Sequence, residues 1–439
     1  MSTLKGLPAV SDARLTSNSV SAASPVEGGT SNANTISVWS VIEFNVDGNK
    51  VIPLRINNSK TIDKTFKSSK TGSFGYCQGT EGEIAAITIK AKFDNPDKKP
   101  QKVKFHVEIK GKVIEGQGLT LIGKSDLVSV STKKKEYTFT VNDFVVPIGF
   151  YKQNLVFTFR YEFENSVTGA SIKSAPIYNF PLKPTLPWTT VKNKKNNPWT
   201  EVLDLLLDKG LEVIDNISDK TSKIKIATAI TKIVNSKLGL IYERSSGETF
   251  FGKSTTTYEL SKFLAHLKKQ PNRGDSGRRV NCTDCACAVT TFANLLGCSL
   301  YNVIFGSYIG SDGKRGFYCN KVLTLRSDAD QNQTWDYPFS DGSSGGFSYH
   351  EICMEGSFDY TSKIYDACLK VNRNVIVFGQ DSYRYPLLPA DTRFSSKNNY
   401  TEIIISTNSQ YYIEWLVKND PAEFNRAMLS GNQGKRSIR

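Results

Sequence analysis

VNCTDCACAVTTFANLLGCSLYNVIFG, residues 280–306, carries the strongest structural signal in this chain and holds four of its eight cysteines. Apolar residues recur at helical spacing between residues 285 and 296, which predicts a buried helix. Asn281 suits the N-cap, because its side-chain oxygen can accept a backbone N–H of the first turn, and Asp284 then falls at the third helical position. Gly297 predicts the end of the helix, and residues 300–305 predict a strand.

Cys282 is the first residue of this predicted helix. A helix N-terminus presents unpaired N–H groups and a positive dipole end, which favour a thiolate, and the thiolate is the reactive form of cysteine. This position therefore makes Cys282 a candidate nucleophile. The alternative is that it packs as a small apolar residue, as most free cysteines do.

Length and composition limit the class of protein. A chain of 439 residues is long enough for two or three domains, and 39% hydrophobic with 22% charged residues is ordinary for a globular protein. No apolar run is long enough to predict a membrane span, and the N-terminus lacks the apolar region of a secretory signal peptide. We therefore expect free thiols and a protein that is cytoplasmic, or exported without a classical signal peptide. The net charge of +14 is spread over predicted strands and loops without an arginine-rich helix, so nucleic acid is not an expected partner.

Pattern and composition divide the chain into five parts. Residues 1–36, rich in small polar residues, predict a disordered leader, and period-two alternation over 37–180 predicts an immunoglobulin-like β-sandwich. Residues 181–199 hold four prolines and predict a linker. Residues 200–418 predict an α+β domain, and 419–439 a C-terminal helix with a frayed basic tail. Within 200–418 we expect helices at 200–217, 224–238 and 258–269, and strands at 317–325, 347–354, 363–371, 375–378 and 400–406.

A cysteine nucleophile needs a base for its proton and a third group that holds the base. Of the three histidines, only His350 follows the cysteine helix within the same predicted domain. Asp366 lies on the next predicted strand, and the loop between them predicts a hairpin. Adjacent antiparallel strands can place the two side chains together, so the sequence predicts a triad of Cys282, His350 and Asp366.

With these residues in place, the chain resembles the transglutaminase-like superfamily of papain-fold thiol enzymes over roughly residues 200–410. That family opens its catalytic helix with Cys-x-Asp-x-Ala and ends it with Leu-Gly, and its histidine begins a strand that precedes the strand of its aspartate. The matching residues are Cys282, Asp284, Ala286, Leu296, Gly297, His350 and the pair Tyr365-Asp366. The resemblance implies a papain-like fold, a Cys-His-Asp triad, a thioester intermediate, a protein or peptide substrate, and neither a metal nor a cofactor.

Several functions are compatible with this triad. A cysteine protease is our first expectation, and a deamidase or transglutaminase effector or toxin that modifies glutamine side chains is the second. A third reading keeps the fold only as a binding scaffold. Cys282 and Cys285 also have CxxC spacing, but no second pair follows to complete a zinc site. As oxyanion donors we expect the backbone N–H of Cys282 and a side chain, with Gln270 and Trp335 as candidates. The substrate and the oligomeric state stay open.

Overall fold

The structure is a computed structural model of the whole chain. It describes residues 37–46, 51–52, 54–55, 62–63, 74–77, 85–94, 103–111, 120–130, 136–144, 149–163, 166–182, 184–185, 198–211, 219–243, 247–252, 257–269, 278–305, 322–325, 349–355, 363–371 and 437–438. The predicted leader 1–36, the predicted strands 375–378 and 400–406, and residues 419–436 of the predicted C-terminal helix and tail lie outside these residues.

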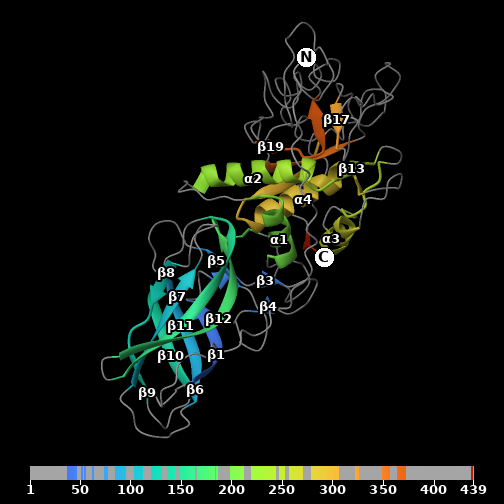
Figure 1. Cartoon of the computed structure of the whole chain (residues 1–439). Coiled ribbons are helices and arrows are strands. Elements are labelled where there is room, and N and C mark those ends of the chain that lie inside the picture. Colours follow the sequence, from blue (N-terminus) through green and yellow to red (C-terminus); the bar gives the residue numbers. More distant parts are fainter. Residues whose placement is uncertain are drawn as a thin grey trace, which may run out of the picture.

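The first part of the chain forms β-sheets (Figure 1). Its strands are β1 (Ser37–Val46), β2 (Val51–Ile52), β3 (Leu54–Arg55), β4 (Ile62–Asp63), β5 (Phe74–Cys77), β6 (Ala85–Asp94), β7 (Val103–Gly111), β8 (Thr120–Lys124), β9 (Val128–Val130), β10 (Glu136–Phe144), β11 (Tyr151–Phe163) and β12 (Ser166–Phe180). One sheet has the order β1-β6-β10, and a second has the order β2-β5-β12-β11-β7-β8 with β9 beside β7. The predicted alternation is confirmed in β10, where Tyr137, Phe139 and Val141 are buried between exposed threonines. The immunoglobulin-like arrangement stays a prediction.

The second part is a mixture of helices and small sheets. Its elements are α1 (Thr200–Asp208), α2 (Asp219–Ser236), β13 (Ile241–Tyr242), β14 (Thr257–Tyr258), α3 (Leu260–Lys268), β15 (Arg279–Val280), α4 (Cys282–Leu295), β16 (Leu300–Phe305), β17 (Val322–Thr324), β18 (His350–Glu355), β19 (Ile364–Tyr365), β20 (Leu369–Val371) and β21 (Ser437–Ile438). Strands β16, β18 and β19 form an antiparallel sheet with β18 in the centre. Helix α4 contacts helix α2 and strands β16 and β18.

Helix α4 confirms the prediction made from residues 280–306. It begins at Cys282, and Asn281 caps it by accepting the backbone N–H of Asp284 at 3.1 Å. Gly297 follows the helix with a φ of 92°, a left-handed conformation that glycine adopts without steric cost. Every residue of α4 is buried.

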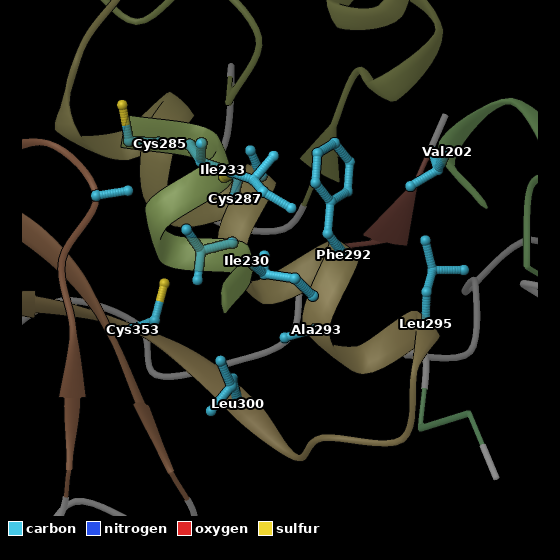
Figure 2. Close-up of a cluster of buried hydrophobic side chains, with 14 of the residues drawn as sticks. Val202, Ile230, Ile233, Cys285, Cys287, Phe292, Ala293, Leu295, Leu300 and Cys353 are labelled. Carbon is cyan, nitrogen blue, oxygen red and sulfur yellow. The ribbon is translucent and has the colours of Figure 1, made fainter. Parts of the chain in front are cut away.

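The core around α4 is apolar. Ile230 and Ile233 of α2 meet Phe292 and Ala293 of α4, and Leu300 of β16 closes the cluster (Figure 2). Protein interiors pack closely, so a helix that packs against both a helix and a sheet has little freedom to shift. This packing fixes the position of the helix N-terminus.

The two parts of the chain share one hydrophobic cluster. Trp199, just before α1, is only 1% exposed, and the guanidinium carbon of Arg55 lies 4.8 Å from the centre of its ring. The Tyr178 hydroxyl at the end of β12 donates to Asp204 Oδ1 of α1 at 2.8 Å. The described ends of the predicted linker 181–199 therefore pack against folded elements.

Two details differ from the sequence prediction. Ser437 and Ile438 form β21, which pairs in parallel with β14, and Ile438 is buried, so the expectation of a frayed end is wrong for these residues. The predicted strand 363–371 is two strands, β19 and β20, because Asp366 leaves the ladder. The Oδ1 atom of Asp366 accepts the backbone N–H of Cys368 at 2.8 Å, a local turn that competes with strand pairing.

Candidate active site

Cys282 lies where α4 begins, and its side chain is buried, with 3% of its surface exposed. The first N–H groups of a helix have no helical acceptor, and the helix dipole places partial positive charge there. The thiol therefore occupies the position that the sequence predicted for it.

A buried carboxylate holds a neighbouring loop against the start of α4. Asp284 Oδ1 accepts the backbone N–H groups of Phe251 at 2.8 Å and Gly252 at 2.9 Å, and its Oδ2 accepts that of Phe250 at 3.0 Å. Oδ2 also accepts the N–H of Asn281 at 3.2 Å, which completes a capping box. Burial raises the pKa of Asp284, although the four N–H groups oppose this by favouring the carboxylate.

Asn281 secures the same loop from the other side. Its Nδ2 donates to the carbonyl oxygen of Gly247 at 3.0 Å and to Thr249 Oγ1 at 2.9 Å. Residues 247–252 are thus held by both capping residues. Sequence reasoning identified the cap but missed this loop, because its contacts with Asp284 span more than thirty residues.

His350 is the first residue of β18, and Asp366 directly follows β19, the neighbouring strand. His350 Nε2 lies 2.8 Å from Asp366 Oδ2, and both side chains are buried. An ionised carboxylate only accepts, so the ring N–H is the donor. The structure therefore brings together the histidine and aspartate that the sequence singled out.

The side chain of Cys282 lies close enough to His350 to raise the pKa of its imidazole. Burial by itself lowers the pKa of His350, but the charge and hydrogen bond of Asp366, together with Cys282, outweigh it and raise this pKa to about 10. At neutral pH the imidazole, bonded to the Asp366 carboxylate, therefore keeps its proton.

Three hydroxyl groups lie beside this set, and sequence reasoning missed them. The Tyr349 hydroxyl is 3.3 Å from Thr283 Oγ1 and is also hydrogen-bonded to Thr249. Burial raises the pKa of Tyr349, and the neighbouring Cys282 raises it further. The available signal was position alone, since Tyr349 precedes His350 and Thr283 follows Cys282.

The other cysteines near α4 have different surroundings. Cys285 and Cys368 are hydrogen-bonded to each other, and burial raises the pKa of both thiols. The Cys353 thiol lies 3.1 Å from the carbonyl oxygen of Ala286, and Cys287 lies 3.6 Å from Asn302 Nδ2 in the cluster of Figure 2. Cys282, by contrast, lies beside His350 and raises the pKa of its imidazole.

Three further predictions from the sequence concern a metal site, a membrane span and the oxyanion donors. Within these ranges, no group of three His, Cys, Asp or Glu side chains is arranged to hold a metal ion. No described helix is long and apolar enough to cross a membrane. Gln270 and Trp335, the candidate oxyanion donors, lie outside the described residues.

The chain matches no protein-family model, and no curated protein matches it in sequence. Among solved structures it is similar to the crystal structure of red sea bream transglutaminase, with 10% sequence identity and a TM-score of 0.32. The match covers 71% of this chain and 54% of that chain, so it spans about half of the transglutaminase. A TM-score of this size does not establish a common fold.

Proposed function

We propose that this protein is a transglutaminase-like thiol enzyme that attacks amide bonds of proteins or peptides. Cys282 is the proposed nucleophile, His350 the acid and base, and Asp366 the group that orients His350. The observation that carries this proposal is the buried hydrogen bond between His350 and Asp366, at the ends of two strands, with Cys282 beside His350 at a helix N-terminus. Such a series matches the requirements of a cysteine nucleophile.

The reaction has two halves. The Cys282 sulfur attacks the amide carbonyl carbon, and the C–N bond breaks after His350 gives its proton to the leaving nitrogen. The product of this half is a thioester on Cys282 and a free amine. In the second half, water attacks the thioester, His350 takes a proton from that water, and the acid and free thiol are released.

The oxyanion of the tetrahedral intermediate needs hydrogen-bond donors. The backbone N–H of Cys282 is the first, since it belongs to the N-terminal turn of α4. Gln270 and Trp335 lie outside the described residues. The Tyr349 hydroxyl is a suitable second donor, because it lies beside Thr283 and close enough to Cys282 for that residue to raise its pKa. Asp366 remains a positioning residue in this scheme.

Hydrolysis of a peptide bond is the first proposed outcome. A second outcome, attack on a glutamine side-chain amide, is favoured by the 3% exposure of Cys282. A side-chain amide on a flexible stem reaches a buried thiol more easily than a main-chain amide does. Water would then give deamidation, and a lysine amine would give cross-linking. Retention of the fold as a non-catalytic scaffold is disfavoured, because binding has no need of an aligned Cys-His-Asp set.

The test is proteomic. Cell lysate is incubated with the wild-type protein, with Cys282→Ala and with Cys287→Ala as a matched control from the same helix. We expect changes with the wild type and the control that are absent with Cys282→Ala. New peptide termini identify cleavage, glutamine-to-glutamate conversion identifies deamidation, and linked peptides identify transfer. The same peptide profile for all three proteins would overturn the proposal.

A further inference from the structure

Two cysteines, Cys282 and Cys285, lie in the first turns of α4, and Cys368 lies beside Cys285. Cys282 and Cys285 are separated by three positions on the helix, so both project from the same face. The Cys285 thiol is hydrogen-bonded to that of Cys368, which follows Asp366 by two residues. The exposed fractions are 3% for Cys282, 1% for Cys285 and 0% for Cys368. The proposed amide chemistry uses only the first of these sulfurs.

We propose that Cys282 and Cys285 are a peroxide-sensitive dithiol, in which Cys285 converts oxidised Cys282 into a reversible disulfide. This modification site goes beyond the proposed function, since it needs only a reactive Cys282. The disulfide removes the nucleophile while it lasts and keeps Cys282 from irreversible oxidation.

The steps balance with hydrogen peroxide as the oxidant. The Cys282 thiolate attacks one peroxide oxygen, the O–O bond breaks, and hydroxide leaves, which gives a sulfenic acid on Cys282. The Cys285 sulfur then attacks the Cys282 sulfur and displaces the hydroxyl group, which leaves as water with the proton of the Cys285 thiol. In total, two thiols and one peroxide give one disulfide and two waters.

The helix favours Cys285 as the resolving residue. Side chains three positions apart on a helix are neighbours, and CxxC pairs are a recurrent redox arrangement. In this scheme Cys368 acts on Cys285 rather than on Cys282. Burial raises the pKa of the Cys285 thiol, and the Cys368 thiol opposes this by donating to the Cys285 sulfur. Burial also selects the oxidant, because peroxide is small enough to reach a thiol that is 3% exposed.

The test uses the full chain and mass spectrometry. The reduced protein is treated with hydrogen peroxide, remaining thiols are blocked with iodoacetamide, and the chain is cleaved after Arg279 by trypsin and before Asp284 by Asp-N. This separates the two sulfurs, so a disulfide between them appears as two linked peptides. We expect the 280–283 peptide linked to the peptide that begins at Asp284, and dithiothreitol should release it.

Variants identify the partner of Cys282. Cys287→Ala, the matched control, should form the same linked peptides, and Cys368→Ala should form them several-fold more slowly. Cys285→Ala should form none and should accumulate sulfinic acid on Cys282 that dithiothreitol does not reverse. A link from Cys282 to Cys368, or irreversible oxidation of Cys282 in the wild type as fast as in Cys285→Ala, would overturn the proposal. The wild-type result needs no variant to fold, and no step of this test depends on amide chemistry.

Discussion

The Oδ2 atom of Asp366 lies 2.8 Å from the Nε2 atom of His350, although sixteen residues separate them in the chain. Strands β18 and β19 pair antiparallel, which brings the two residues to the same end of the sheet. The other carboxylate oxygen of Asp366 accepts the backbone N–H of Cys368. One side chain thus fixes the imidazole and the chain turn after β19 together.

Replacement of Asp366 by asparagine tests its positioning role. Asparagine keeps the shape but removes the charge that stabilises protonated His350, so we expect kcat to fall by roughly 10²–10⁴-fold while KM changes little. Once a substrate is identified, steady-state kinetics measure this split. The control is Glu351→Gln, because Glu351 is a buried carboxylate of the neighbouring strand β18 that accepts a hydrogen bond from Asn302. An equal loss in both variants would point to a general effect on the sheet.

The raised pKa of His350 predicts a dependence of stability on pH. The folded protein keeps a proton on His350 up to about pH 10, whereas the unfolded chain loses it near 6.5. Stability from this proton is therefore complete below 6.5, and the free energy of unfolding falls as the pH rises toward 10. Denaturant unfolding under reducing conditions at several pH values measures this fall. It should be smaller in Asp366→Asn, and an unchanged fall would contradict the assignment.

Asp284→Asn tests the bonds between α4 and residues 247–252. An amide group cannot accept at both of its ends, so at least one of the four N–H donors loses its partner. We expect the free energy of unfolding to drop by about 1–3 kcal/mol. Chemical denaturation measures the drop, with the exposed Asp126→Asn as the control. No difference between the two variants would show that the loop adds nothing to stability.

Trp199→Ala tests the contact between the two parts of the chain. Removal of a buried tryptophan side chain should cost about 3–5 kcal/mol, and it also removes the partner of Arg55. Leu127→Ala is the control, because Leu127 is 44% exposed and should change stability by less than about 0.5 kcal/mol. Thermal unfolding followed by circular dichroism compares the variants. A Trp199→Ala protein as stable as the control would mean that the contact is not maintained in solution.

The sequence predicted α4 well because its signals are local. A cap, an acidic third position, an apolar stripe and a terminal glycine all lie within seventeen residues and agree with one another. The proximity of His350 and Asp366 followed from a hairpin, which is nearly as local. The catalytic roles of these residues stay a prediction until activity is measured.

Features that depend on distant contacts could not be read from the sequence. The loop 247–252 meets Asp284 through backbone N–H groups, which every residue except proline carries, so no residue type marks the contact. The strand is interrupted at Asp366, and the sequence did not predict this because the apolar residues on both sides favour one continuous strand. Ile438 forms a strand because β14 offers it an edge, and nothing near the end of the sequence indicates that edge.

The most direct test of the Cys282–His350 pair needs no substrate. We would measure the rate of Cys282 alkylation by iodoacetamide at neutral pH in the reduced wild-type protein and in His350→Gln, with peptide mapping to assign the modified residue. We predict that Cys282 is alkylated at least about tenfold more slowly in the variant, because glutamine cannot replace the imidazole that activates the sulfur. Equal rates in the two proteins would contradict the proposed pairing and the chemistry built on it.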